Sequence, residues 1–157
     1  MLVRDFHPDD ASALAQVFHA SVRIIGTKDY TQSQVSSWSP QPVEAEDFLK
    51  RVSDGRNVFV AVNDMDEPEA FIELEKNGHI DCFYCHPNVA GTDVGSALYD
   101  RLESTAKQSG IDYLFVEASE AAKRFFSRKG FVVEHRHDFE RRGVAIHNYR
   151  MVKVLKS

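Results

Sequence analysis

The stretch HIDCFYCHPNVAGTDVGSALYDRL, residues 79–102, decides the fold. Its first part, residues 79–86, has the composition of a strand, and a proline then stops it because proline donates no backbone hydrogen bond. A short loop at 88–93 opens directly into a helix at 94–108, whose apolar residues recur at helical spacing. Another apolar strand follows at 113–116. This order predicts a βαβ unit, and a right-handed crossover makes its two strands parallel.

The flanking segments predict further strands and helices. Strands are predicted at 2–6, 58–62, 69–76, from 131 onward and at 144–155. Helices are predicted from a cap at Asp9 or Asp10 through 22, over 43–52, and from a cap at Ser119 to just before Gly130, whereas 24–42 is irregular. Asn77-Gly78 is a hairpin signal, so the remaining strands should pair antiparallel. We therefore expect an α/β (α+β) fold: one domain over 1–157, with a mixed, mostly antiparallel sheet around the parallel unit and helices on both faces.

Composition and charge narrow the class of protein. Hydrophobic residues make up 43% and charged residues 27% of 157, which are ordinary values for one globular domain. Because 19 basic residues face 24 acidic ones, the net charge of -5 argues against nucleic acid and against anionic membranes as partners. There is no disulfide scaffold, signal peptide pattern or apolar run of membrane-spanning length, so we expect a cytoplasmic protein.

The loop before the helix has the features of an anion site. Gly91 permits a turn or a close backbone approach, and Gly95 lies in the first helical turn, where a missing side chain admits a bulky anion. The first N–H groups of a helix have no partner within it, so together these groups form a phosphate cradle. A P-loop does not fit, because three residues separate these glycines and Ser96 stands where lysine is needed. The alternative interpretation is a helix N-terminus with a glycine for packing.

Two segments together resemble a known family. The pair His86-Pro87 with the loop AGTDVGSAL, and then EASEAAKRFFSRKGF, resemble the GNAT N-acetyltransferases. In that family the loop reads roughly R/Q-x-x-G-x-G/A, and the later helix reads N-x-x-A-x-x-F-Y-x-x-x-G-F. The resemblance covers residues 58–134 and the element order of the chain. The segments YTQSQVSSW and RRGVAIHNYRMVK further resemble a small bacterial group of the family, the YafP-like proteins.

The resemblance implies a reaction and a set of binding residues. Acetyl-CoA would be the co-substrate, and its acetyl group would pass to a primary amine of a small acceptor by direct attack, without a covalent enzyme intermediate. A backbone N–H near residues 83–85 would polarise the thioester carbonyl. The residues implied at the acetyl-CoA site are Phe83, Tyr84, Cys85, Ala90, Gly91, Thr92, Asp93, Val94, Gly95, Ser96, Ser119 and Phe126.

Three of these positions depart from the family pattern. Ala90 replaces Arg or Gln, Asp93 replaces glycine beside a loop for pyrophosphate, and Phe126 replaces a tyrosine that often protonates the leaving thiolate. These departures favour an alternative function, a CoA or acyl-CoA sensor that has lost catalysis. The cationic cluster of the same helix is either a solvated face or a replacement for the missing cation; its members are Lys123, Arg124, Arg128 and Lys129.

Candidate catalytic and acceptor residues come from other segments. Glu73 is the first choice for the general base and Glu75 the second, because residues two apart on a strand share one face. The alternative is an ordinary solvated face of a hairpin. Tyr30 and Trp38 either form a flat apolar wall of the acceptor pocket, which is where the resemblance puts this region, or cover the core.

A metal site is not expected. Cys82 and Cys85 lie three apart on a predicted strand, so their side chains face opposite sides and do not converge on one ion. Small buried cysteines filling a sheet are the better interpretation. The oligomeric state stays open, with pairing of the final strand across a homodimer as one option.

Overall fold

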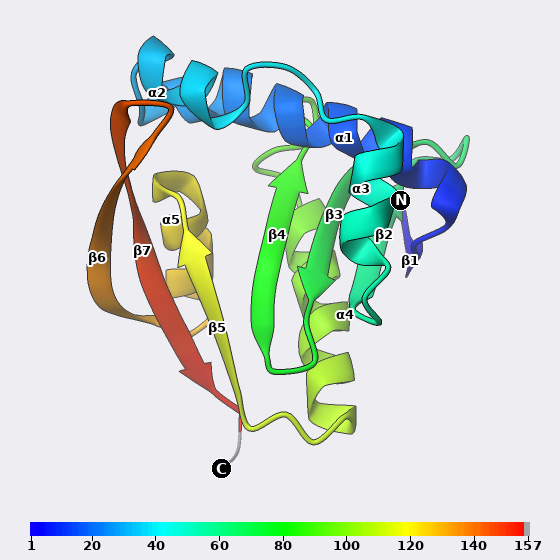
Figure 1. The fold of residues 1–157 in the computed structure, drawn as a ribbon. Helices are drawn as coiled ribbons and strands as arrows, with labels where there is room; N and C mark the ends of the chain where they lie inside the picture. Colours follow the sequence, from blue (N-terminus) through cyan, green and yellow to red (C-terminus); the bar gives the residue numbers. More distant parts are fainter. Residues whose placement is uncertain (156–157) are drawn as a thin grey trace.

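The computed structural model describes residues 1–155 and has a seven-stranded sheet with helices on both faces (Figure 1). The strand order is β1-β2-β3-β4-β5-β7-β6. Among the described residues β4 and β5 form the one parallel pair, which confirms the predicted mixed, mostly antiparallel sheet with a central βαβ unit. The strands are β1 (Leu2–Asp5), β2 (Asn57–Val62), β3 (Pro68–Leu74), β4 (His79–Cys85), β5 (Tyr113–Ala118), β6 (Val132–Arg141) and β7 (Val144–Val154).

The helices cover the two faces of the sheet unequally. In Figure 1, α1 and α3 lie on one face, over β2 to β4, α2 lies beside the β6–β7 hairpin, and α4 and α5 lie on the other face. Short 3-10 and π-helical turns at Pro8–Asp10, Ser21–Ile25 and Gly26–Lys28 adjoin α1. No helix within residues 1–155 has the length and apolar character needed to cross a bilayer. The helices are α1 (Ala11–Ala20), α2 (Gln32–Trp38), α3 (Ala45–Val52), α4 (Val94–Gln108) and α5 (Glu120–Arg128).

Helix α2 corrects the prediction of an irregular segment at 24–42. Its N-terminus is a capping box: the Gln34 backbone N–H donates to Thr31 Oγ1 at 3.1 Å, and the Thr31 N–H donates to Gln34 Oε1 at 2.8 Å. The T-x-x-Q spacing is a recognised helix start, so the signal was present in the sequence. The short length of the helix explains why its apolar spacing gave no clear periodicity.

The core forms two layers because side chains alternate along each strand. In β3, Phe71 packs into the cluster with α1 and α3, while Ile72 and Leu74 pack into the larger cluster with α4. Glu73 shares the α3 side with Phe71, as its contact with Arg51 shows. This alternation determines on which face of the sheet each β3 side chain lies.

The parallel pair separates soon after it forms. Register pairs between β4 and β5 are found only at His79 and Ile80, so in the described chain β4 has no partner on that side from Asp81 onward. The next β3–β4 hydrogen bond fixes the alternation along the ladder, because the His86 N–H donates to Glu69 O at 2.7 Å. Because antiparallel ladders alternate, the N–H groups of Phe83 and Cys85 point away from β3, into the opening.

The final strand is not at an edge of the sheet. β7 lies between β5 and β6 and pairs with both, so its backbone groups are already used within the chain. The option that the final strand pairs across a homodimer is therefore wrong. The edges of the sheet are β1 and β6, and β6 runs from Val132 to Arg141, in agreement with a strand predicted from 131 onward. A homodimer as such stays a prediction.

Candidate active site

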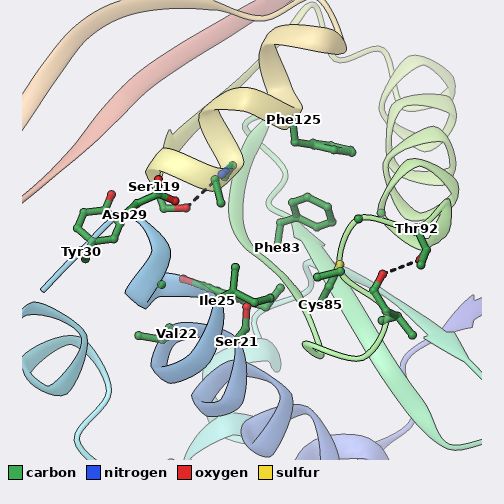
Figure 2. A pocket seen from close by; sticks show the side chains of 18 of the residues that line it. Ser21, Val22, Ile25, Asp29, Tyr30, Phe83, Cys85, Thr92, Ser119 and Phe125 are labelled. Atoms are coloured by element: carbon green, nitrogen blue, oxygen red, sulfur yellow. Dashed lines mark hydrogen bonds between the residues drawn. The ribbon is translucent and has the colours of Figure 1, made fainter. Parts of the chain in front are cut away.

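A cavity with a volume of about 260 Å³ lies at the opening between β4 and β5 (Figure 2). One wall comes from β4 and α5, with Phe83 and Phe125 facing each other, and the opposite wall comes from the turn after α1, with Val22 and Ile25. The loop that leads into α4 borders a third side. The cavity therefore joins three segments that are far apart in the sequence.

Most of the predicted binding residues meet at this cavity. Those that line it are Tyr30, Trp38, Phe83, Tyr84, Cys85, Ala90, Gly91, Thr92, Gly95, Ser96 and Ser119. The predicted residues that do not line it are Glu73, Glu75, Asp93, Val94 and Phe126. Further lining residues, which the sequence did not single out as a site, are Ser21, Val22, Ile25, Gly26, Asp29, Val35, Val89, Ala121, Ala122 and Phe125.

The loop before α4 presents backbone donors without acceptors. Thr92 closes the turn, because its hydroxyl donates to Val89 O at 2.6 Å and its N–H donates to the same oxygen at 3.2 Å. Gly91 takes φ +80°, a left-handed conformation that other residues rarely adopt. Within residues 1–155, the N–H groups of Gly91, Gly95 and Ser96 have no hydrogen-bond acceptor. Outward-pointing amides at a helix N-terminus have the geometry of an anion site.

Gly95 contributes to this site in a different way from the one predicted. A Cβ at Gly95 would lie 3.1 Å from Phe83 Cζ and 3.5 Å from Phe125 Cε2. The space left by its missing side chain is thus occupied by an aromatic wall and is not open to a bulky anion. Gly95 allows β4, α4 and α5 to pack closely, while its N–H remains available.

Asp93 and Arg128 set the charge around the loop. Asp93 is exposed and makes no side-chain capping hydrogen bond to α4. Arg128 lines the cavity and has no ion-pair partner in the described part of the chain, whereas Arg124 pairs with Asp29 at 2.8 Å and Lys129 with Asp100 at 3.4 Å. Of the predicted cationic cluster, Arg128 is the member placed to meet an anion in the cavity.

Replacing Asp93 with asparagine is expected to strengthen CoA binding about threefold. Two like unit charges about 6 Å apart repel each other by roughly 0.7 kcal/mol in a water-like dielectric, which is a factor of about three in affinity for each phosphate charge at that separation. Titration calorimetry with CoA at low salt measures the change, and Asp100→Asn, on the solvent side of α4, is the matched control. Unchanged or weaker binding by the Asp93 variant alone would contradict the loop as the anion site.

Replacing Gly91 with alanine is expected to raise the KM for acetyl-CoA about five- to tenfold. Its φ of +80° strains any L side chain by about 1 kcal/mol, and relief of that strain turns the amides of the loop away from the anion. Gly110 also has a positive φ, +76°, and open space around it, so Gly110→Ala is a control with the same strain away from the cavity. Equal KM values for acetyl-CoA in the two variants would argue against the loop as the anion-binding site.

Phe126 is a core residue, and the neighbouring Phe125 lines the cavity where Phe126 was expected. Phe126 is 0% exposed and packs against Tyr99 and Phe131, with ring centroids 6.1 and 4.9 Å away. Phe125 faces the cavity beside Phe83, with centroids 4.8 Å apart. The motif puts Phe126 at the tyrosine position of the family, but the turn of α5 directs the neighbouring ring, that of Phe125, toward the cavity.

Neither predicted base reaches the cavity. Glu73 is 0% exposed, and its carboxylate accepts hydrogen bonds from Arg51 at 2.6 and 2.7 Å and from Arg56 at 2.8 Å. Glu75 accepts from His79 at 2.6 Å on the same side of the sheet. Both guanidinium groups engage the Glu73 carboxylate, and neither Glu73 nor Glu75 lines the cavity. The geometry thus makes Glu73 a buried ion-pair partner and Glu75 the partner of a histidine.

Tyr30 is anchored between three elements. Its hydroxyl accepts from the Glu120 N–H at the start of α5 at 3.0 Å and donates to His147 O in β7 at 3.1 Å. The Tyr30 and Trp38 rings meet edge-on with centroids 6.0 Å apart. Burial raises the pKa of Tyr30 to about 12, so its hydroxyl stays protonated near neutral pH. These rings are packed and also border the cavity, while their role as the wall of an acceptor pocket stays a prediction.

The two cysteines lie on opposite faces of β4. Cys85 packs against the α4 cluster and lines the cavity, while Cys82 packs against the α1 and α3 cluster, so their side chains diverge as predicted. Burial raises the pKa of the Cys85 thiol to about 11. A thiol in this state is a poor nucleophile, which is consistent with direct transfer.

Comparison with known proteins identifies the family to which this chain belongs. The profile of the acetyltransferase (GNAT) domain matches residues 26–153. The uncharacterized N-acetyltransferase YafP of Escherichia coli is 27% identical over 149 residues, which is 95% of this chain and 93% of that protein. The peptidyl-lysine N-acetyltransferase YjaB of the same organism is 30% identical over 97 residues, covering 62% and 64% of the two chains.

Solved structures agree with this assignment. A GCN5-related N-acetyltransferase from Rhodopseudomonas palustris superposes with a TM-score of 0.89 at 33% identity, covering 98% of this chain and 95% of that one. The fold of yncA from Salmonella typhimurium, solved with acetyl-CoA, gives a TM-score of 0.76 at 19% identity over 100% and 95% of the chains. This chain belongs to the GNAT family, whose members are acetyl-CoA-dependent acyltransferases.

Proposed function

We propose that this protein transfers the acetyl group of acetyl-CoA to a primary amine of a small molecule by direct attack. The residues at the cavity fit the donor. The unpaired amides of Gly91, Gly95 and Ser96 suit the pyrophosphate, and Arg128 adds one cation. The opening beside β4 suits an extended arm that pairs with its backbone, as strand edges do.

The edge of β4 would supply the electrostatic part of catalysis. The Phe83 and Cys85 N–H groups point into the opening, so either can donate to a thioester carbonyl oxygen. Negative charge develops on that oxygen as the amine attacks, and a fixed donor then stabilises it most. The carbon–nitrogen bond forms and the carbon–sulfur bond breaks. The proton that the amine nitrogen loses passes to the departing CoA thiolate or to water, because Phe126 has no proton to donate.

The single observation that favours a small acceptor is the closure of the cavity by residues 26–38, which we term the strap. Gln34 Nε2 donates to Ala145 O at 2.9 Å, and Arg142 of the β6–β7 hairpin donates to Ser37 O. Tyr30 and the Asp29–Arg124 ion pair tie the strap to β7 and α5. A segment fastened at both sides in this way favours a small acceptor over a polypeptide.

The test is release of CoA thiol from acetyl-CoA in the presence of small primary amines or of a lysine-containing peptide. We expect turnover with at least one small amine and much slower turnover with the peptide. Faster reaction with the peptide would contradict a small acceptor. A thermal shift with CoA but no turnover with any amine would instead support the sensor function, which Ala90, Asp93 and Phe126 favour.

A further inference from the structure

The acceptor half of the cavity has a hydrophobic cluster of its own. Val22, Tyr30 and Val35 are each at most 9% exposed and form a third cluster, separate from the two core layers. Trp38 and Tyr84 pack against it. We call these five residues the acceptor chamber. All five line the cavity, and Figure 2 shows Val22 and Tyr30 on the wall opposite Thr92 of the α4 loop.

The chamber offers no free negative charge. Asp29 is the one carboxylate that lines the cavity within residues 1–155, and Arg124 holds both its oxygens, at 3.1 and 2.8 Å. The Arg141 guanidinium lies 5.6 Å from the centre of the Trp38 ring. A substrate with several ammonium groups would therefore bury charges without partners, which is costly.

We infer that the acceptor is a monoamine whose single amino group is attached to an apolar body, aromatic or branched aliphatic. This inference rests on the proposed acetyl transfer and narrows its substrate class. Apolar walls favour the neutral form of a bound amine over the ammonium form, and the neutral form is the nucleophile. The same walls explain how the amine is deprotonated although neither Glu73 nor Glu75 reaches the cavity.

The first measurement compares kcat/KM for 2-phenylethylamine and for 1,5-diaminopentane, which have similar lengths. We expect the aromatic monoamine to be preferred by about tenfold or more. Val22→Asp should reverse this preference, because it adds a carboxylate to the chamber. Val43→Asp, at an exposed position outside the cavity, should not. An unchanged KM for acetyl-CoA verifies that each variant is folded. Preference of the wild-type protein for the diamine would overturn the inference.

A second measurement does not require turnover. Trp38 is the only tryptophan of the chain, so its fluorescence reports on the chamber directly. In the protein saturated with CoA, 2-phenylethylamine should change the Trp38 emission at concentrations about tenfold lower than 1,5-diaminopentane. The reverse order, or no response to the aromatic amine, would overturn the inference. Binding in this order without any acetylation would leave the chamber assignment standing and refute the proposed transferase reaction.

Discussion

Replacing Cys85 with proline is expected to lower kcat by about 100-fold. Proline removes the N–H that points from β4 into the opening, and the loss of one oxyanion donor typically costs a factor of about 10²–10³ in kcat. The substitution is compatible with the sheet, because this N–H does not bond to β3 and β4 has no partner on its other side here. Steady-state kinetics with saturating acetyl-CoA measures the effect.

Cys85→Ala is the matched control for this experiment. It removes the thiol and keeps the backbone donor, so kcat should stay within about twofold of the wild-type value if transfer is direct. CoA titration and thermal melting establish that the proline variant remains folded. A folded proline variant with full kcat would refute the donor role of the Cys85 N–H. An inactive alanine variant would point to a thiol role instead.

Replacing Glu73 with glutamine is expected to reduce the free energy of unfolding by about 3–5 kcal/mol. Removing one partner of a buried ion pair is strongly destabilising, and here Arg51 and Arg56 both lose the fully buried carboxylate between them. Both arginines keep only partly exposed partners, Asp81 for the two of them and Asp54 for Arg56. In a chain of this length that loss corresponds to a fall in Tm of about 6–20 °C. Thermal and denaturant unfolding measure the change.

The same variant separates a structural role from a catalytic one. We expect kcat at low temperature to remain near the wild-type value, since the carboxylate does not reach the cavity. Glu134→Gln, which breaks the exposed pair with Arg150, should cost about 1 kcal/mol or less. A Glu73 variant that keeps its Tm but loses activity would restore Glu73 as the general base.

The central part of the fold could be predicted from the sequence because the signals for it lie within short stretches of the chain. The helix at 94–108 was predicted with the bounds that α4 shows, since its apolar spacing, the preceding loop and the glycine after it agree. The Asn77-Gly78 turn and the βαβ order then settled the direction of β4 and β5. The region before residue 43 was less clear, because α2 is short and its main signal is a capping box.

The residues of the site also differ in whether a local sequence signal pointed to them. The α4 loop and the Ser119 cap are each a local pattern, so motifs were sufficient to single out these residues, which line the cavity. Val22, Asp29 and Val35 come from segments without a motif, and they meet the cavity only because the strap docks on β7 and α5. Their role depends on long-range contacts that no short window of sequence contains.

By itself, the sequence determined the class of fold, the parallel crossover and the amide-rich loop, because hydrogen bonding and side-chain alternation over a few residues are sufficient for these. Only the tertiary structure decided which face of the sheet each residue serves. Alternation tells us that Glu73 and Glu75 share a face, but not that Arg51 and Arg56 occupy it. It also decided that Phe125, and not Phe126, borders the cavity, because the rotation of α5 is set by packing against β5, β7 and Tyr99.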